Sequence, residues 1–501
     1  MALEVFSRRF ILGALLSGVA TRTLAGAPEQ SLRPQPRGNN DPLIALKQAV
    51  RPAQELIGEA GLGGNVSYVV ADARTGLVLE SRASLRRHPP ASVTKTITAL
   101  YALDALGAEF RFATKLVATG PLQNGIIQGD LVLEGGGDPV LNTDYLADMA
   151  RNLKEAGVRG VKGQFQVYAG ALPFIPVIDR GQPDHLGYNP SVSGLNLNFN
   201  RVHFEWKRGA GGYDVAMDAR SERYRPAVSM AKMQIVDRDL PIYTFSSGQE
   251  VDHWTVAQKA LGKGGSRWLP VRHPAVYAAE VFQTLARAQG IRLKQAQIRQ
   301  TRPNGLALVE HQSAPLSVIL KGLLKYSTNL TAEVVGLTAT QARGVVARSL
   351  SESAREMNRW MHENLGTTQS RFVDHSGLEE SNRTTAHDMV GALVKEGPGS
   401  PLSRLLKQIP MRDAKGRKIK DHPVRVRAKT GTLNFVSALA GYVTAPDGTE
   451  LAFAIFASDM ERRAGITRSD REIPKGAKGW NKRAKRMQQG LIERWIGLYG
   501  I

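Results

Sequence analysis

A stretch that begins at Pro89, PPASVTKTITALYALDAL, constrains the fold more than any other part of the chain. Two prolines lead into a long apolar segment, which predicts a largely buried helix over residues 92–106. Ser92 and Lys95 stand on its first turn, three positions apart. Lysine is rare on a buried surface unless its ammonium has a partner or a chemical role. Residues three positions apart lie on the same face of a helix, so Lys95 can accept the proton of Ser92. The unpaired N–H groups at the start of the helix can stabilise an oxyanion.

Two later motifs support this interpretation. Ser327 and Asn329 stand between two helical segments in KYSTNLTAE, and Lys429 begins the strand RAKTGTL. Ser-x-x-Lys, Ser-x-Asn and Lys-Thr-Gly in this order are typical of penicillin-binding proteins and serine β-lactamases. The chain has a second Ser-x-x-Lys, from Ser229 to Lys232, but no long apolar helix follows it, so we expect it to lie on the surface.

Each residue type suits one step of acyl transfer. Ser92 would attack a carbonyl and form an acyl-enzyme, while Lys95 takes its proton. Ser327 would relay a proton to the leaving amine, and Lys429 would supply positive charge. Asn329 would hydrogen-bond to the substrate amide. The backbone N–H groups of Ser92 and Thr432 would form the oxyanion hole. Thr430 or Thr432, which flank Gly431, would bind a terminal carboxylate.

From these motifs the sequence resembles the low-molecular-mass class C penicillin-binding proteins, the D-alanyl-D-alanine carboxypeptidase/endopeptidases. LVLEGGGDPVL, VDHSGLEESNRTT and YNPSVSGLNLNFNRV also resemble segments of this family, and the likeness covers residues 45–500. It implies a serine hydrolase that removes the terminal D-Ala from peptidoglycan stem peptides and is acylated by β-lactam antibiotics. Cleavage of D-Ala–diaminopimelate crosslinks is a second reaction that the sequence leaves open.

The resemblance also suggests a pocket for the side chain of the stem peptide. Tyr188 matches the family's tyrosine, and Leu378 ends the matching Ser-Gly-Leu segment. Asp184 lies one place nearer to Tyr188 than the family's aspartate, so a turn residue after a proline is an equal interpretation. Glu379 and Glu380 stand where the family often has Ser and Arg, which predicts an altered choice of side chain.

The gap of 235 positions between Ser92 and Ser327 is much longer than in simple β-lactamases. The resemblance explains this gap by one or two strand-rich domains inserted in a transpeptidase-like domain. We therefore expect an α+β fold, an antiparallel sheet flanked by helices, with the catalytic domain formed by residues 28–112 and 305–501 and the insertion by residues 113–304.

The N-terminus predicts export. Arg8 and Arg9 precede an apolar run over residues 10–20, which is typical of a twin-arginine signal peptide over residues 1–27. The run is too short to span a bilayer, so we expect a periplasmic protein with no membrane span after cleavage. Residues 28–42 are predicted to be a linker.

Charge and composition exclude several kinds of site. The net charge is +21, but the 66 Lys and Arg residues are spread along the chain and no nucleic-acid motif occurs, so we expect no nucleic-acid partner. The chain has no cysteine, and its ten histidines show no metal-binding spacing, so we expect no metal and no cofactor. The basic run near the C-terminus is predicted to be the solvated face of a helix packed on the sheet, rather than of one that lies on a membrane.

Two alternative functions remain at this point. A serine β-lactamase would share Ser92, Lys95 and Lys429, but no Glu-x-x-Leu-Asn segment supplies the base that fast deacylation needs. The second alternative is a non-catalytic wall-binding protein. The presence of all five motif residues, Ser92, Lys95, Ser327, Asn329 and Lys429, argues against it.

Overall fold

The computed structural model describes residues 50–413 and 415–500. The predicted export signal and the predicted linker lie outside this range. Among the described residues, no helix combines the length and the apolar character that crossing a membrane requires.

A six-stranded antiparallel sheet joins the two ends of the described chain, in the order β17-β18-β19-β20-β1-β2. Its strands are β1 (Asn65–Asp72), β2 (Val78–Arg82), β17 (Lys407–Ile409), β18 (Arg425–Leu433), β19 (Val436–Thr444) and β20 (Glu450–Ser458). Side chains alternate between two cores: Val69 of β1 faces one core and Val70 faces the other. Because both faces are covered, all nine residues of β19 are buried.

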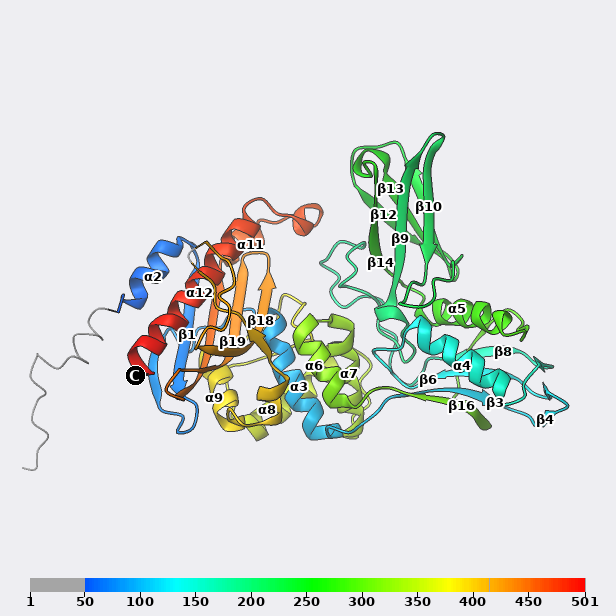
Figure 1. Ribbon diagram of the computed structural model, residues 1–501, viewed down its shortest axis with the longest axis horizontal. Helices are drawn as coiled ribbons and strands as arrows, with labels where there is room; N and C mark the ends of the chain where they lie inside the picture. The colour runs from blue at the N-terminus through cyan, green and yellow to red at the C-terminus, as the bar shows by residue number, and fades with distance from the viewer. Residues whose placement is uncertain (1–49, 414, 501) are drawn as a thin grey trace, which may run out of the picture. The chain divides into compact units, whose positions relative to one another are not determined.

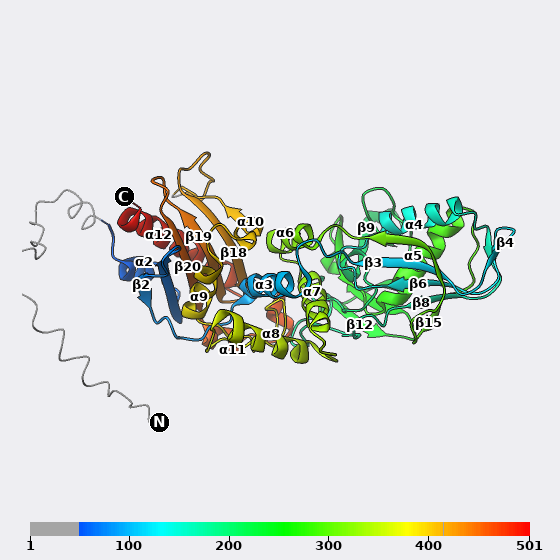
Figure 2. The same ribbon diagram turned by 90° about the horizontal axis from the view of Figure 1, so that it is seen from below.

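Helices cover both faces of this sheet. On one face α12 (Ala477–Tyr499) packs on β19 with α2 (Ala53–Ala60) beside it (Figure 1). Trp480 and Trp495 of α12 are buried, whereas Lys482 and Lys485 are exposed, which confirms the predicted packing of the basic C-terminal helix. On the other face α9 (Ala386–Glu396) packs on β20 and β1 (Figure 2).

The predicted buried helix forms the centre of the helical layer. It starts as the 3₁₀ turn η1 (Ala91–Val93) and continues as α3 (Thr94–Leu106), whose first nine residues are all buried. Helix α3 packs mainly against three longer helices. Those helices are α6 (Leu316–Tyr326), α7 (Asn329–Ala342) and α8 (Leu350–Leu365); the short α10 (Pro401–Leu405) also contacts α3 and α6.

The segment between α3 and α6 has its own core and its own sheets. One sheet has the order β15-β8-β6-β3-β16, and three three-stranded sheets have the orders β10-β9-β14, β11-β13-β12 and β4-β5-β7. The elements are β3 (Ala113–Ala118), β4 (Leu122–Gln123), β5 (Ile126–Ile127), β6 (Leu131–Gly135), α4 (Thr143–Glu155), β7 (Gly160–Val161), β8 (Phe165–Tyr168), β9 (Arg201–Gly209), β10 (Gly212–Asp218), β11 (Ala231–Val236), β12 (Tyr243–Ser247), β13 (Asp252–Ala257), β14 (Gly264–Pro270), α5 (Pro274–Ala288), β15 (Gln297–Arg299) and β16 (Leu306–Gln312). Because β16 pairs with β3, we propose that the insertion extends to residue 312 rather than ending at 304.

The expected α+β architecture is therefore confirmed. Alternating apolar residues in LNLNFNRVHFEW are typical of a strand, but the strand begins only at Arg201. Asn198, Phe199 and Asn200 instead have positive φ in a 3₁₀ turn. Asparagine tolerates this conformation, and the Asn198 and Asn200 side chains hydrogen-bond to surrounding groups.

Candidate active site

The turn that carries Ser92 is fixed by close backbone contacts. Ala91 is buried with φ +48°, and its carbonyl oxygen would lie 1.9 Å from a side chain at Gly377, which itself has φ +76°. A side chain at Gly431 would lie 2.6 Å from the carbonyl oxygen of Pro90. Glycine is therefore required at both positions by the space available, so that β18 and the 377 loop can approach the start of α3.

Lys95 lies next to Ser92 and is completely buried. Its Nζ atom donates to Ser92 Oγ at 3.0 Å, to Asn329 Oδ1 at 2.7 Å and to the carbonyl oxygen of Ser376 at 2.6 Å. Burial lowers the pKa of Lys95 to about 8, and the negative charges of Asp374 and Glu333 limit this decrease. The Lys95 amine is thus held beside the Ser92 hydroxyl with a pKa near neutral.

Two buried carboxyl groups fix the loop that holds Lys95. Glu333 accepts from the backbone N–H groups of His375 and Ser376, both at 2.9 Å. Asp374 accepts from the N–H of Gly377 at 2.7 Å and from that of Glu379 at 2.8 Å. The motifs in the sequence do not include Glu333, although a glutamate four positions after Asn329 in an apolar helix is a signal of such a role.

The second lysine pairs with the second serine. Lys429 Nζ donates to Ser327 Oγ at 3.0 Å and to the carbonyl oxygen of Thr430 at 2.7 Å. Burial lowers the pKa of Lys429 well below its usual value, and the charge of Lys95 lowers it further. Ser327 has φ +62° at the sharp junction between α6 and α7, which turns its hydroxyl toward β18.

A pocket of about 350 Å³ opens on Ser92. Ser327, Asn329 and Thr432 line it together with Ser92, so the structure brings these predicted residues together. Thr430 does not line this pocket. It lies in a separate depression with Ile409 and Met411, so the structure favours Thr432 over Thr430 as the threonine that faces a substrate.

Three residues were predicted to line a pocket for the side chain of the stem peptide, and the structure places them differently. Tyr188 and Leu378 line the Ser92 pocket. The Tyr188 backbone oxygen accepts from Asn329 Nδ2 at 2.9 Å, and burial raises the pKa of the Tyr188 hydroxyl to about 12. Asp184 is not a lining residue, because its carboxylate pairs with Arg468 at 2.9 Å.

Arginines form a further wall of the Ser92 pocket that the sequence did not reveal. Arg463 and Arg471 line the pocket, and both form ion pairs with Glu380, at 3.4 and 3.3 Å. Glu380 is one of the two residues at which the sequence departs from the family pattern. The wall therefore carries two positive charges that share one carboxylate.

Two other sequence features lie away from this chemistry. Ser229 and Lys232 of the second Ser-x-x-Lys are both exposed, as expected. His375 is buried, its Nε2 lies 2.7 Å from Ser353 Oγ, and burial lowers its pKa to about 3. His375 is therefore a neutral packing residue of the loop.

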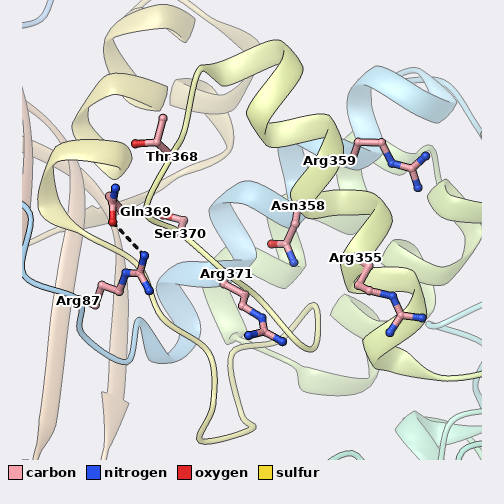
Figure 3. Close-up of a pocket in the computed structure, with 8 residues that line it drawn as sticks. All are labelled: Arg87, Arg355, Asn358, Arg359, Thr368, Gln369, Ser370 and Arg371. Carbon is pink, nitrogen blue, oxygen red and sulfur yellow. Dashed lines mark hydrogen bonds between the residues drawn. The ribbon is translucent and has the colours of Figure 1, made fainter.

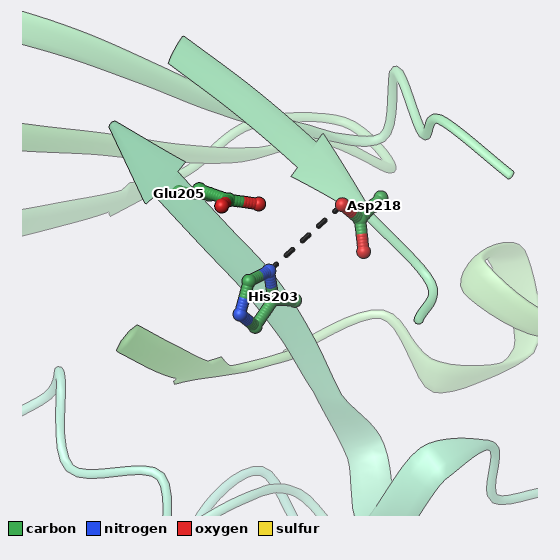
Figure 4. A group of neighbouring side chains, drawn as sticks. All are labelled: His203, Glu205 and Asp218. Atoms are coloured by element: carbon green, nitrogen blue, oxygen red, sulfur yellow. Dashed lines mark ion pairs between the residues drawn. The ribbon is translucent and has the colours of Figure 1, made fainter. Parts of the chain in front are cut away.

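A group with metal-ligating atoms occurs on β9 and β10. The side chains of His203, Glu205 and Asp218 lie within 4.8 Å of one another, and His203 Nδ1 faces Asp218 (Figure 4). The guanidinium of Arg220 already pairs with both carboxylates, at 2.6 Å to Glu205 and 2.9 Å to Asp218. A cation would have to displace this arginine, so we interpret the group as an ion-pair cluster.

Comparisons with known proteins agree with this geometry. Residues 53–473 match the model of the D-Ala-D-Ala carboxypeptidase 3 (S13) family. The chain is 27% identical to a D-alanyl-D-alanine carboxypeptidase of Actinomadura sp. (strain R39), over 80% of this chain and 79% of the relative. It is 23% identical to the D-alanyl-D-alanine carboxypeptidase DacB of Haemophilus influenzae, over 82% of this chain and 90% of the relative.

A solved structure shows the same fold. The crystal structure of penicillin-binding protein 4 (dacB) from Haemophilus influenzae superposes with a TM-score of 0.70 at 20% identity, and covers 88% of this chain and 99% of that protein. The family match spans most of the chain. The chain therefore belongs to the D-Ala-D-Ala carboxypeptidase 3 (S13) family, and is a serine-type hydrolase.

Proposed function

We propose that this protein is a periplasmic D-alanyl-D-alanine carboxypeptidase that trims peptidoglycan stem peptides through an acyl-enzyme on Ser92. The observation that carries the proposal is the buried Lys95 amine 3.0 Å from the Ser92 hydroxyl, with a pKa lowered to about 8. At pH 7.5 roughly a quarter of such amines are neutral and can accept a proton. Ordinary lysines are almost fully protonated at this pH.

In the proposed acylation, Ser92 Oγ attacks the carbonyl carbon of the penultimate D-Ala, and its proton passes to Lys95 Nζ. The backbone N–H groups of Ser92 and Thr432 would stabilise the oxyanion. The proton then reaches the leaving amine of the terminal D-Ala through Ser327 Oγ, which lies 3.0 Å from Lys429 Nζ. Breakage of the amide C–N bond releases D-Ala and leaves the acyl group on Ser92, which water then hydrolyses.

The Lys429 amine and the Thr432 hydroxyl would hydrogen-bond to the substrate's terminal carboxylate at the end of β18. Asn329 would bind the substrate amide, since its Nδ2 and Oδ1 atoms are oriented by Tyr188 and Lys95. The same machinery would be acylated by β-lactams. The Haemophilus influenzae protein with this fold is known in complex with a β-lactam, which supports this part of the proposal.

A β-lactamase is less well supported, because rapid deacylation needs a basic group near Ser92. Among the described residues, Glu472 is the carboxylate that lines the Ser92 pocket. Hydrogen bonds from His185 and Arg267 lower the pKa of Glu472 to about 2. Such a carboxylate is a weak base, so we propose slow hydrolysis of the penicilloyl-enzyme.

Release of D-Ala from a soluble peptide ending in Lys-D-Ala-D-Ala tests the proposal. The parent protein should release one D-Ala per peptide, and Ser92→Ala should release none. Ser229→Ala is the matched control, because it changes the exposed serine of the second Ser-x-x-Lys and should retain full activity. A parent that releases no D-Ala, or an active Ser92→Ala, would overturn the proposal. A crosslinked muropeptide dimer as substrate tests for endopeptidase activity, and fractionation of the host tests for the periplasm.

A further inference from the structure

An arginine-rich depression lies apart from the Ser92 pocket and shares no lining residue with it. It has a volume of about 560 Å³. Four arginines surround it, Arg87, Arg355, Arg359 and Arg371, and we call it the arginine pocket (Figure 3). The other lining residues are Asn358, Thr368, Gln369 and Ser370, which are uncharged and polar. Among residues 50–413 and 415–500, no apolar side chain lines it, which disfavours an acyl chain or a hydrophobic protein surface as its ligand.

The positive charge of the arginine pocket is largely uncompensated. Arg359 pairs with Glu356. In the part of the chain that the structure describes, Arg87, Arg355 and Arg371 form no ion pair with a carboxylate, and Arg87 instead donates to Gln369 Oε1 at 2.9 Å. Arg355 and Arg359 lie four positions apart on α8, where like charges repel one another. An anion bound between these side chains would relieve the repulsion.

The backbone under the arginine pocket is fixed. The N–H groups of Gln369 and Ser370 donate to Asp388 Oδ2 at 2.9 and 2.7 Å. Asn358 bonds to the N–H and the carbonyl oxygen of Phe372, at 2.9 and 2.8 Å. Arg371 and Arg383 exchange two backbone hydrogen bonds. The arginines therefore extend from a rigid base rather than from a loose loop.

The arginine pocket is linked to the active site by two short segments. Arg87 lies five positions before Ser92, and Arg371 lies five positions before Ser376, whose carbonyl oxygen holds Lys95. An extended chain covers at most about 3.6 Å per residue, so each pair of Cα atoms lies within about 18 Å. One polymeric substrate can reach both places.

We propose that the arginine pocket is a second binding site for peptidoglycan, which captures free carboxylates of the peptide strands. This inference rests on the proposed function, because it takes the wall polymer as the substrate. Guanidinium groups match carboxylates in a bidentate geometry, and the polar lining suits a hydrated peptide. Binding a neighbouring peptide here would raise the local concentration of stem peptides at Ser92.

Pelleting with purified sacculi tests the proposal in the inactive Ser92→Ala background. The variant Arg87→Gln/Arg355→Gln/Arg371→Gln should bind sacculi at least about tenfold more weakly than the background. The matched control removes three exposed arginines elsewhere, as Arg208→Gln/Arg292→Gln/Arg348→Gln, and should bind nearly normally. Equal losses in the two triple variants would show nonspecific charge attraction and would overturn the proposal.

Two further measurements separate the other outcomes. Binding to phosphatidylglycerol vesicles that depends on the arginine pocket, without binding to sacculi, would indicate a membrane ligand and would also overturn it. With Ser92 restored, the pocket variant should keep the parent rate on the small soluble peptide and lose activity on sacculi. A parent that releases no D-Ala from the small peptide would refute the proposed function, whatever the binding result.

Discussion

The amine of Lys95 lies 3.0 Å from the hydroxyl of Ser92 and is closed off from solvent. This relationship explains how a lysine is accommodated in a helix whose first nine residues are all buried. Three oxygen atoms accept from the amine, and burial shifts its pKa to a range in which it can act as a base.

Replacing Lys95 by Ala should slow acylation strongly while the fold is retained. A general base contributes about 10²- to 10⁴-fold to the rate, so acylation by a fluorescent penicillin should slow by that factor. The second Ser-x-x-Lys provides the control, because Lys232→Ala removes an exposed lysine and should change nothing. Acylation of the Lys95 variant at the parent rate would contradict the assigned role.

Acylation should rise with pH through an apparent pKa of about 8. Burial lowers the pKa of Lys95, so the amine is protonated below pH 8 and neutral above it, and only the neutral form accepts the Ser92 proton. Stopped-flow rates between pH 5.5 and 9.5 would show this profile. A rate independent of pH across this range would exclude Lys95 as the base.

Glu333→Gln tests the buried carboxyl that supports Lys95. Burial raises the pKa of Glu333 to about 8, and the ionised form of Glu333 raises the pKa of Lys95, so its removal should move the midpoint of the acylation profile to lower pH. An amide can accept from only one of the N–H groups of His375 and Ser376, which should cost about 1–3 kcal/mol in the free energy of unfolding. The exposed Glu363→Gln is the control. A loss of stability with an unchanged midpoint would limit Glu333 to a structural role.

Gly377→Ala should destabilise the protein and slow acylation. Its Cβ would lie 1.9 Å from the Ala91 carbonyl oxygen at φ +76°, so the turn that carries Ser92 must move. We expect a loss of about 2–4 kcal/mol in the free energy of unfolding, from overpacking and strain. Gly391→Ala on α9 is the comparison, since nothing lies within 4 Å of its new methyl group. Equal midpoints of thermal unfolding for the two variants would contradict this account.

Glu380→Gln should change the choice of stem-peptide side chain. Glu380 is the shared carboxylate of Arg463 and Arg471, so its loss leaves two positive charges on the wall of the Ser92 pocket. We expect kcat/KM for a diaminopimelate peptide, relative to a lysine peptide, to increase about 1.5- to 5-fold, the range for a partly exposed ion pair. The neighbouring Glu379→Gln should leave this ratio unchanged. An unchanged ratio in Glu380→Gln would place the side-chain pocket elsewhere.

The sequence was informative where chemistry is encoded in short motifs or strong periodicity. It predicted α3 and the assembly of Ser92, Lys95, Ser327, Asn329 and Lys429, because these residue types in this order match a known pattern. It did not reveal the arginine wall, since Arg463 and Glu380 are 83 positions apart and meet only through the tertiary fold. It also did not distinguish Thr430 from Thr432, because the direction of a side chain on β18 depends on register and packing.

The most direct test of the account is a peptide mass spectrum of the mature protein after brief exposure to penicillin. We expect one penicilloyl group, on the peptide that contains Ser92, and no adduct in Ser92→Ala. An adduct on another serine, or no adduct while the penicillin remains intact, would contradict Ser92 as the nucleophile. Consumption of the penicillin without an adduct would show fast deacylation, which contradicts the proposed carboxypeptidase and indicates a β-lactamase.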